Sequence, residues 1–138
     1  MIVLDTNVIS EPLRPAASAS VLAWLDRQNI ETLFLTTISL AELRYGVAAL
    51  PDGRRKQGLR AALDDRIIAL FGSRILPFDR AAADAYALVR TRAKEAGIAI
   101  AAADGYIAAT AMAHGFAVAT RDTKPFVAAG VGTIDPWV

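Results

Sequence analysis

The chain opens with Met1-Ile-Val-Leu-Asp-Thr-Asn-Val-Ile-Ser10, and this stretch is the best guide to its architecture. Ile2, Val3 and Leu4 form an apolar run that is too short for a helix and typical of a buried strand. The run stops at Asp5, so the predicted strand ends on a carboxylate. Because ligands bind at the carboxyl ends of strands in open α/β sheets, Asp5 is the first candidate for a functional site.

Beyond this stretch, candidate strands alternate with candidate helices. Short apolar runs predict strands over residues 32–36, 75–78, 116–120 and 132–134, and Pro77 indicates an edge strand. Apolar spacing and capping residues predict helices over residues 8–13, 18–25, 39–50, 54–71, 79–96, 104–113 and 124–128. Alternation of this kind is typical of parallel strands joined by right-handed crossovers. We therefore expect a three-layer α/β/α fold with a central, mainly parallel sheet of four to five strands, as one domain over residues 1–138.

Composition and charge narrow the class of protein. Of the 138 residues 54% are hydrophobic, which argues against a disordered chain. Lys and Arg total 15 against 14 Asp and Glu, so a nucleic-acid partner would have to be recognised by local patches. Cysteine is absent, which excludes disulfides and thiolate chemistry. Because the sequence has no basic leader segment and no apolar run of the ~20 residues that a membrane helix needs, we expect a cytoplasmic protein without a membrane partner.

Four acidic residues fall near predicted strand ends or helix starts. Asp5 ends the first strand, and Glu42 lies near the start of the helix that follows the second. Asp122 directly follows the fourth strand, so these three would share the carboxyl edge of a parallel sheet. Asp104 begins a helix that leads into a strand, and topology does not place it with the others. Oxygen ligands without His or Cys suit Mg²⁺ or Mn²⁺.

Each acid also has a purely structural interpretation. Asp5 could close an Asx turn, and Glu42 could form a capping box with Ser39. Asp104 could complement a helix dipole, and Asp122 could be a turn residue. Carboxylates gathered at one place repel one another unless a cation or proton neutralises them, and this favours a metal site if the four lie together.

Four segments of the chain carry a resemblance to a known family. They are IVLDTNVISEPLR at 2–14, SLAELRYG at 39–46, ADGYIAAT at 103–110 and VATRDTK at 118–124. In this order they resemble the PIN-domain ribonucleases, in particular the VapC toxins and their FitB-like members. The resemblance spans essentially the whole chain. It implies a PIN fold and a Mg²⁺- or Mn²⁺-dependent endoribonuclease, the toxin of a type II toxin–antitoxin pair, which hydrolyses RNA phosphodiesters.

The resemblance also implies roles for individual residues. The family's four acidic positions, which bind metal and carry out catalysis, correspond to Asp5, Glu42, Asp104 and Asp122. The last of these positions varies in the family and is often asparagine. Polar positions that orient ligands or water correspond to Thr6, Asn7 and Thr120. Gly105 stands where many relatives have alanine.

Partners and substrate contacts are further expectations. The resemblance implies a cognate antitoxin encoded beside the gene, a homodimer, and a higher assembly with the antitoxin on operator DNA. Arg121 and Lys124 flank Asp122 and are candidates for contact with the RNA substrate. The basic run 54–56 is either a solvated helix start or an RNA-binding patch. The alternative function is a largely non-catalytic partner that dimerises and assembles an antitoxin into a DNA-binding repressor complex, with surfaces supplied by residues 39–71 and the helix that bears Trp24.

Overall fold

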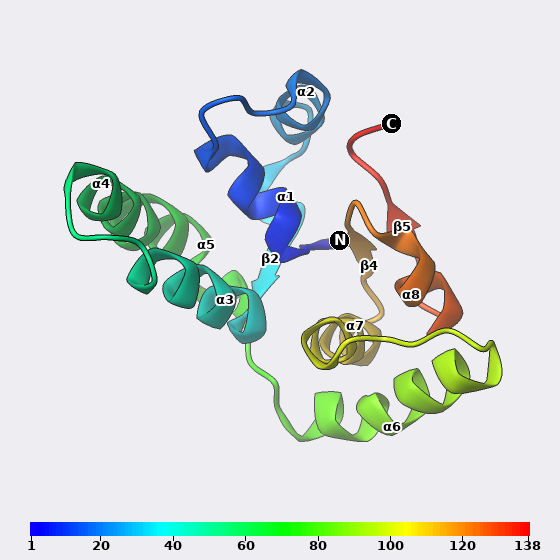
Figure 1. The fold of residues 1–138 in the computed structure, drawn as a ribbon. Coiled ribbons are helices and arrows are strands. Elements are labelled where there is room, and N and C mark those ends of the chain that lie inside the picture. Colours follow the sequence, from blue (N-terminus) through cyan, green and yellow to red (C-terminus); the bar gives the residue numbers. More distant parts are fainter.

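A five-stranded sheet lies at the centre of the computed structural model, which describes residues 1–138 (Figure 1). The strands are β1 (Ile2–Leu4), β2 (Leu33–Thr36), β3 (Ile75–Leu76), β4 (Ala117–Ala119) and β5 (Thr133–Ile134). They lie in the order β3-β2-β1-β4-β5, and every neighbouring pair is parallel. The predicted parallel sheet is confirmed, and the first strand of the chain is its central strand.

Helices cover both faces of this sheet and complete the predicted three-layer α/β/α fold (Figure 1). One layer contains α1 (Thr6–Ser10), α2 (Ala19–Asp26), α3 (Thr37–Ala48), α4 (Arg54–Ala62) and α5 (Ala69–Phe71). The other contains α6 (Arg80–Glu95), α7 (Ala102–His114) and α8 (Thr123–Ala128). Figure 1 shows α6, α7 and α8 on the side of the sheet opposite to α3, α4 and α5.

Two hydrophobic clusters fix the helical layers to the sheet. Neighbouring residues of β1 belong to different clusters, as the two-residue period of a strand requires. Val3 packs in one cluster with Val118 and Phe126, whereas Leu4 packs in the other with Leu35. Each fully buried aliphatic side chain of this kind contributes roughly 1.5–3 kcal/mol of stability. A strand of three residues is therefore anchored firmly from both faces.

Several element ends differ from the prediction for local reasons. The helix predicted over 8–13 is wrong at both ends, because Asp5 caps a helix that begins at Thr6 and Pro12 lies in a separate 3₁₀ turn. The helix predicted over 54–71 contains a π-helical segment, Leu63–Ile68, between α4 and α5. The edge strand β3 stops at Leu76, since Pro77 has no backbone N–H for the ladder.

None of the helices combines the length and the apolar character needed to cross a membrane.

The order of the strands reverses at β1. From β1 the chain continues to β2 and β3 on one side, then crosses over and forms β4 and β5 on the other side. In open parallel sheets, ligands bind in the crevice at the carboxyl ends of the two strands that flank such a reversal. Here those strands are β1 and β4, and Asp5 and Thr120 are the residues that directly follow them.

Candidate active site

Asp5 is held in one orientation at the carboxyl end of β1. Its backbone N–H donates to the carbonyl of Ala119 at 2.9 Å, which continues the ladder between β1 and β4. Its Oδ1 accepts from the Thr6 N–H at 2.8 Å, and its Oδ2 accepts from the Thr120 hydroxyl at 2.8 Å. The Asp5 residue is only 5% exposed. Each oxygen thus receives one hydrogen bond and retains a lone pair for a further partner.

Thr6 links Asp5 to helix α3. Its Oγ1 lies 2.6 Å from Glu42 Oε1 and 3.0 Å from Ser39 Oγ. A carboxylate can only accept, so the Thr6 hydroxyl donates to Glu42 and accepts from Ser39. The cap of α3 is Thr36, whose hydroxyl oxygen accepts from the Ser39 N–H at 3.1 Å. The capping-box interpretation is therefore wrong, and Glu42 is instead directed toward the end of β1.

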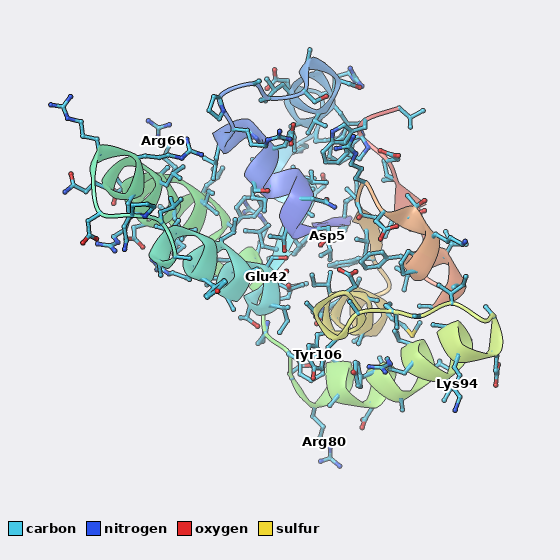
Figure 2. The ribbon with its side chains drawn as sticks, viewed as in Figure 1. Asp5, Glu42, Arg66, Arg80, Lys94 and Tyr106 are labelled. Atoms are coloured by element: carbon cyan, nitrogen blue, oxygen red, sulfur yellow. The ribbon has the colours of Figure 1, made fainter.

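The two remaining acids complete one group of carboxylates. Asp122 donates its backbone N–H to Thr120 Oγ1 at 3.2 Å, and its side chain does not cap α8. Asp104 lies in the first turn of α7, and the negative charges of the other three acids all act on its carboxyl group. Figure 2 shows Asp5 and Glu42 where α1, α3 and α7 meet. We call this group the acidic site; its members are Asp5, Glu42, Asp104 and Asp122.

Burial and mutual repulsion raise the pKa of two of these carboxyl groups. Burial, followed by the charges of the other three acids, raises the pKa of Asp104 from 3.8 to about 6. Burial also raises the pKa of Asp5, although its hydrogen bonds from Thr120 and Thr6 act in the opposite direction. Carboxyl groups that resist ionisation in this way favour a nearby cation, which would restore their charged form.

The donor set of the acidic site fits a hard divalent cation. It offers carboxylate oxygens without His or Cys, the ligands that Mg²⁺ and Mn²⁺ prefer. Asn7, two residues after Asp5, has a buried Oδ1 atom without a hydrogen-bond partner. No three acidic side chains converge closely enough to hold an ion by themselves. An ion bound here would therefore need water or substrate oxygens as further ligands, as Mg²⁺ has in sites with one or two carboxylates.

The two cations predicted to contact RNA flank Asp122 in the sequence, and neither is bound in an ion pair. The guanidinium of Arg121 lies over the ring of Trp137, 5.2 Å from its centroid. Lys124 is exposed on α8. Both positive charges are thus accessible next to Asp122.

Two pockets that are lined in part by Glu42 adjoin the acidic site. A pocket of about 260 Å³ between α1, α3 and α4 is lined by Thr6 and Glu42 together with Arg14 and Arg55. The basic run 54–56 thus contributes one side chain to this pocket. A second pocket lies between α3 and α7, and Tyr45 and Tyr106 contribute to its lining. Both tyrosines lie within segments that carry the family resemblance, 39–46 and 103–110, but neither differs by its spacing from an ordinary helix residue.

Comparison with known proteins gives one consistent result. The family model described as PIN domain matches residues 2–131. The chain is 55% identical to Toxin FitB of Neisseria gonorrhoeae, over 99% of each chain. It is 53% identical to VapC ribonuclease Y4jK of Sinorhizobium fredii, over 99% of this chain and 98% of the relative. Among solved structures, FitAB bound to an IR36 DNA fragment is similar with a TM-score of 0.97 and 53% identity, and covers 100% of this chain and 96% of that one.

Proposed function

The chain belongs to the PIN-domain family, and from this premise we propose that it is a Mg²⁺- or Mn²⁺-dependent endoribonuclease, the toxin of a type II toxin–antitoxin pair. Relatives named VapC ribonuclease and Toxin FitB, which are similar over nearly the whole chain, support this proposal. The structural observation that supports it most is the Asp5 carboxylate at the carboxyl end of β1, which is linked through Thr6 to Glu42 and lies close enough to Asp104 for their charges to interact.

In this proposal the residues of the site have distinct tasks. Asp5 and Asp104 would hold the ion, and the bonds from Thr6 and Thr120 keep the Asp5 carboxylate in one orientation. When bound, the metal would activate a water and neutralise charge on the scissile phosphate.

Glu42 and the residues around it would act on the attacking water. Thr6 fixes the carboxylate of Glu42, which would position that water or take part in holding a second ion. The unpartnered Oδ1 of Asn7 would accept a hydrogen bond from a water in the site. Asp122 would add negative charge at the end of β4, either as a direct ligand of the metal or through a water bound to it.

Imidazole catalysis does not enter the proposal. His114, the only histidine, lies at the opposite end of α7 from Asp104, where its ring packs 5.3 Å from that of Phe116. The RNA would instead be held by cations beside the acids, and Arg121 and Lys124 are the residues that we propose for this contact.

A second proposed role concerns assembly. A relative 53% identical to this chain has been solved as the FitAB complex bound to DNA. We infer that this chain likewise forms a homodimer, is inhibited by a cognate antitoxin and joins it in a larger complex on operator DNA. Assembly without catalysis is the alternative function, and the two roles can coexist. Molecular mass in solution, with and without the co-expressed antitoxin, would measure the assembly.

The decisive experiment is a cleavage assay on protein freed of any partner. A mixed RNA pool would be incubated with wild type in Mg²⁺, in Mn²⁺ and in EDTA, beside a folded Asp5→Asn variant. Asp84→Asn, which removes an exposed carboxylate on α6, would serve as the matched control. We expect cleavage by wild type and Asp84→Asn that needs metal, and none by Asp5→Asn. A wild type that binds no metal and cuts no RNA would leave only the assembly role.

A further inference from the structure

An open pocket of about 450 Å³ adjoins the acidic site between α3 and α7. Its lining residues are Ile38, Ala41, Glu42, Tyr45, Ala103 and Tyr106. Glu42 belongs both to this pocket and to the acidic site, where its carboxylate accepts the hydrogen bond from Thr6. Ala103 directly precedes Asp104. The pocket is therefore continuous with the place where the scissile phosphate would lie.

Tyr106 is held in place at this pocket by other aromatic rings. Its ring stacks on that of Tyr86, with centroids 4.9 Å apart and an interplanar angle of 25°. Phe78 packs against Tyr106 edge-on, with centroids 5.0 Å apart. Gly105 lets the Tyr86 ring approach α7, because a Cβ there would lie 3.1 Å from that ring. In Figure 2, Tyr106 lies between α7 and the start of α6.

Tyr45 differs from Tyr106 in being free of its neighbours. It is 76% exposed and pairs with no other aromatic ring. It follows Glu42 by one helical turn, and residues three apart lie side by side on a helix surface. The pocket is thus bordered by a fixed ring on α7 and an accessible ring on α3.

We propose that this pocket binds a base of the RNA strand beside the scissile phosphate, with Tyr45 and Tyr106 as its stacking faces. The inference rests on the proposed ribonuclease function and names its substrate class, unpaired RNA. Aromatic side chains bind single-stranded nucleic acid by stacking, which every base permits. No Lys or Arg lines the pocket, so its chemistry suits the uncharged base rather than the phosphate. A base paired within a duplex could not enter.

The test measures binding without cleavage. Anisotropy of a labelled single-stranded RNA would be titrated with Asp5→Asn protein in Mg²⁺, alone or combined with Tyr45→Ala or Tyr45→Phe. We expect Tyr45→Ala to weaken binding about tenfold, as for loss of one stacked base, and Tyr45→Phe to retain it. The dependence of the binding constant on salt concentration should not change, because the substitution removes no charge. Leu70→Ala, which shortens another exposed apolar side chain on α5 (54% exposed), should bind like the parent.

Several outcomes would overturn the inference. One is equal binding by Tyr45→Ala and its parent, or no binding by the parent. Another is that Tyr45→Ala loses affinity by the same factor for an oligonucleotide that lacks bases, because base stacking would then not be the cause. A third is a dimeric parent that Tyr45→Ala makes monomeric, since a second copy of the chain would then cover this face. Failure of the ribonuclease proposal would appear separately, as a wild type that does not cut RNA in metal.

Discussion

Asp104 carries a charge that opposes folding, and its removal should stabilise the protein in EDTA. Burial and the negative charges of Asp5, Glu42 and Asp122 raise its pKa from 3.8 to about 6. Above that pH the folded chain must hold a carboxylate that the unfolded chain exposes to water. Asp104→Asn keeps the size of the side chain and removes the charge, so it isolates this effect.

The magnitude and sign follow from the pKa. A rise from 3.8 to about 6 corresponds to at most about 3 kcal/mol, since one pH unit is ~1.4 kcal/mol. Between these two pH values the folded protein binds more protons than the unfolded chain. The free energy of unfolding of wild type therefore decreases as pH rises through this window, whereas the asparagine variant lacks this contribution. The stability difference should be largest above pH 6 and should vanish below 3.8.

Thermal unfolding followed by circular dichroism in EDTA tests this reasoning. Near neutral pH, Asp104→Asn should melt several degrees above wild type, at roughly 2–5 °C per kcal/mol for a chain of this length. At about pH 4 the two should melt together. Asp84→Asn, the exposed control, should have the melting temperature of wild type at both pH values. Adding Mg²⁺ should raise the melting temperature of wild type more than that of Asp104→Asn. A variant no more stable than wild type at neutral pH, or a difference independent of pH, would refute the argument.

Three further predictions concern single contacts. Thr120→Val removes the donor to buried Asp5 Oδ2, so it should lower the free energy of unfolding by about 1–3 kcal/mol. It should also move the acidic limb of the cleavage profile to higher pH, because that bond lowers the pKa of Asp5; an unmoved limb would contradict this role. Arg121→Ala should weaken RNA binding and reduce the salt slope by about 0.7, and an unchanged slope would remove Arg121 from the RNA contact. Gly105→Ala should destabilise by up to ~1–2 kcal/mol in urea, because its Cβ would lie 3.1 Å from the Tyr86 ring and outweigh the better helix propensity of alanine; a stabilised variant would show that the ring gives way.

The sheet and the place of Asp5 could be predicted because their signals are local. The apolar run Ile2–Leu4 ends abruptly at a carboxylate, and alternation of strands with helices leaves parallel pairing as the natural arrangement. The helices predicted over 18–25 and 79–96 start at the capping residues Ser18 and Asp79, and both side chains accept a hydrogen bond from a backbone N–H of the following turn. These features depend on a few neighbouring residues, so they can be predicted from the sequence.

Other parts of the site depend on packing between distant elements. Asp104 lies at the start of a helix that precedes its strand, and only the packing of α7 beside α3 brings it to Glu42. The spacing of Ser39 and Glu42 matches a capping box. In the structure the Glu42 side chain instead accepts a hydrogen bond from the Thr6 hydroxyl. Tyr45 has the pattern of any solvent-facing helix residue, and the role proposed for it depends on the pocket beside it. Spacing alone cannot encode such relations.

The register of the central strand has a consequence for a chain still in synthesis. Leu4 pairs with Ala119, so the first strand acquires one of its two neighbours only after residue 119 has been made. Until then Asp5 lacks both the ladder bond to Ala119 and the hydroxyl of Thr120, and Asp122 does not yet exist. If the chain is the proposed nuclease, a nascent chain cannot assemble the acidic site before residues 119–122 have been made. Activity would begin only once the late strand has paired with the early one.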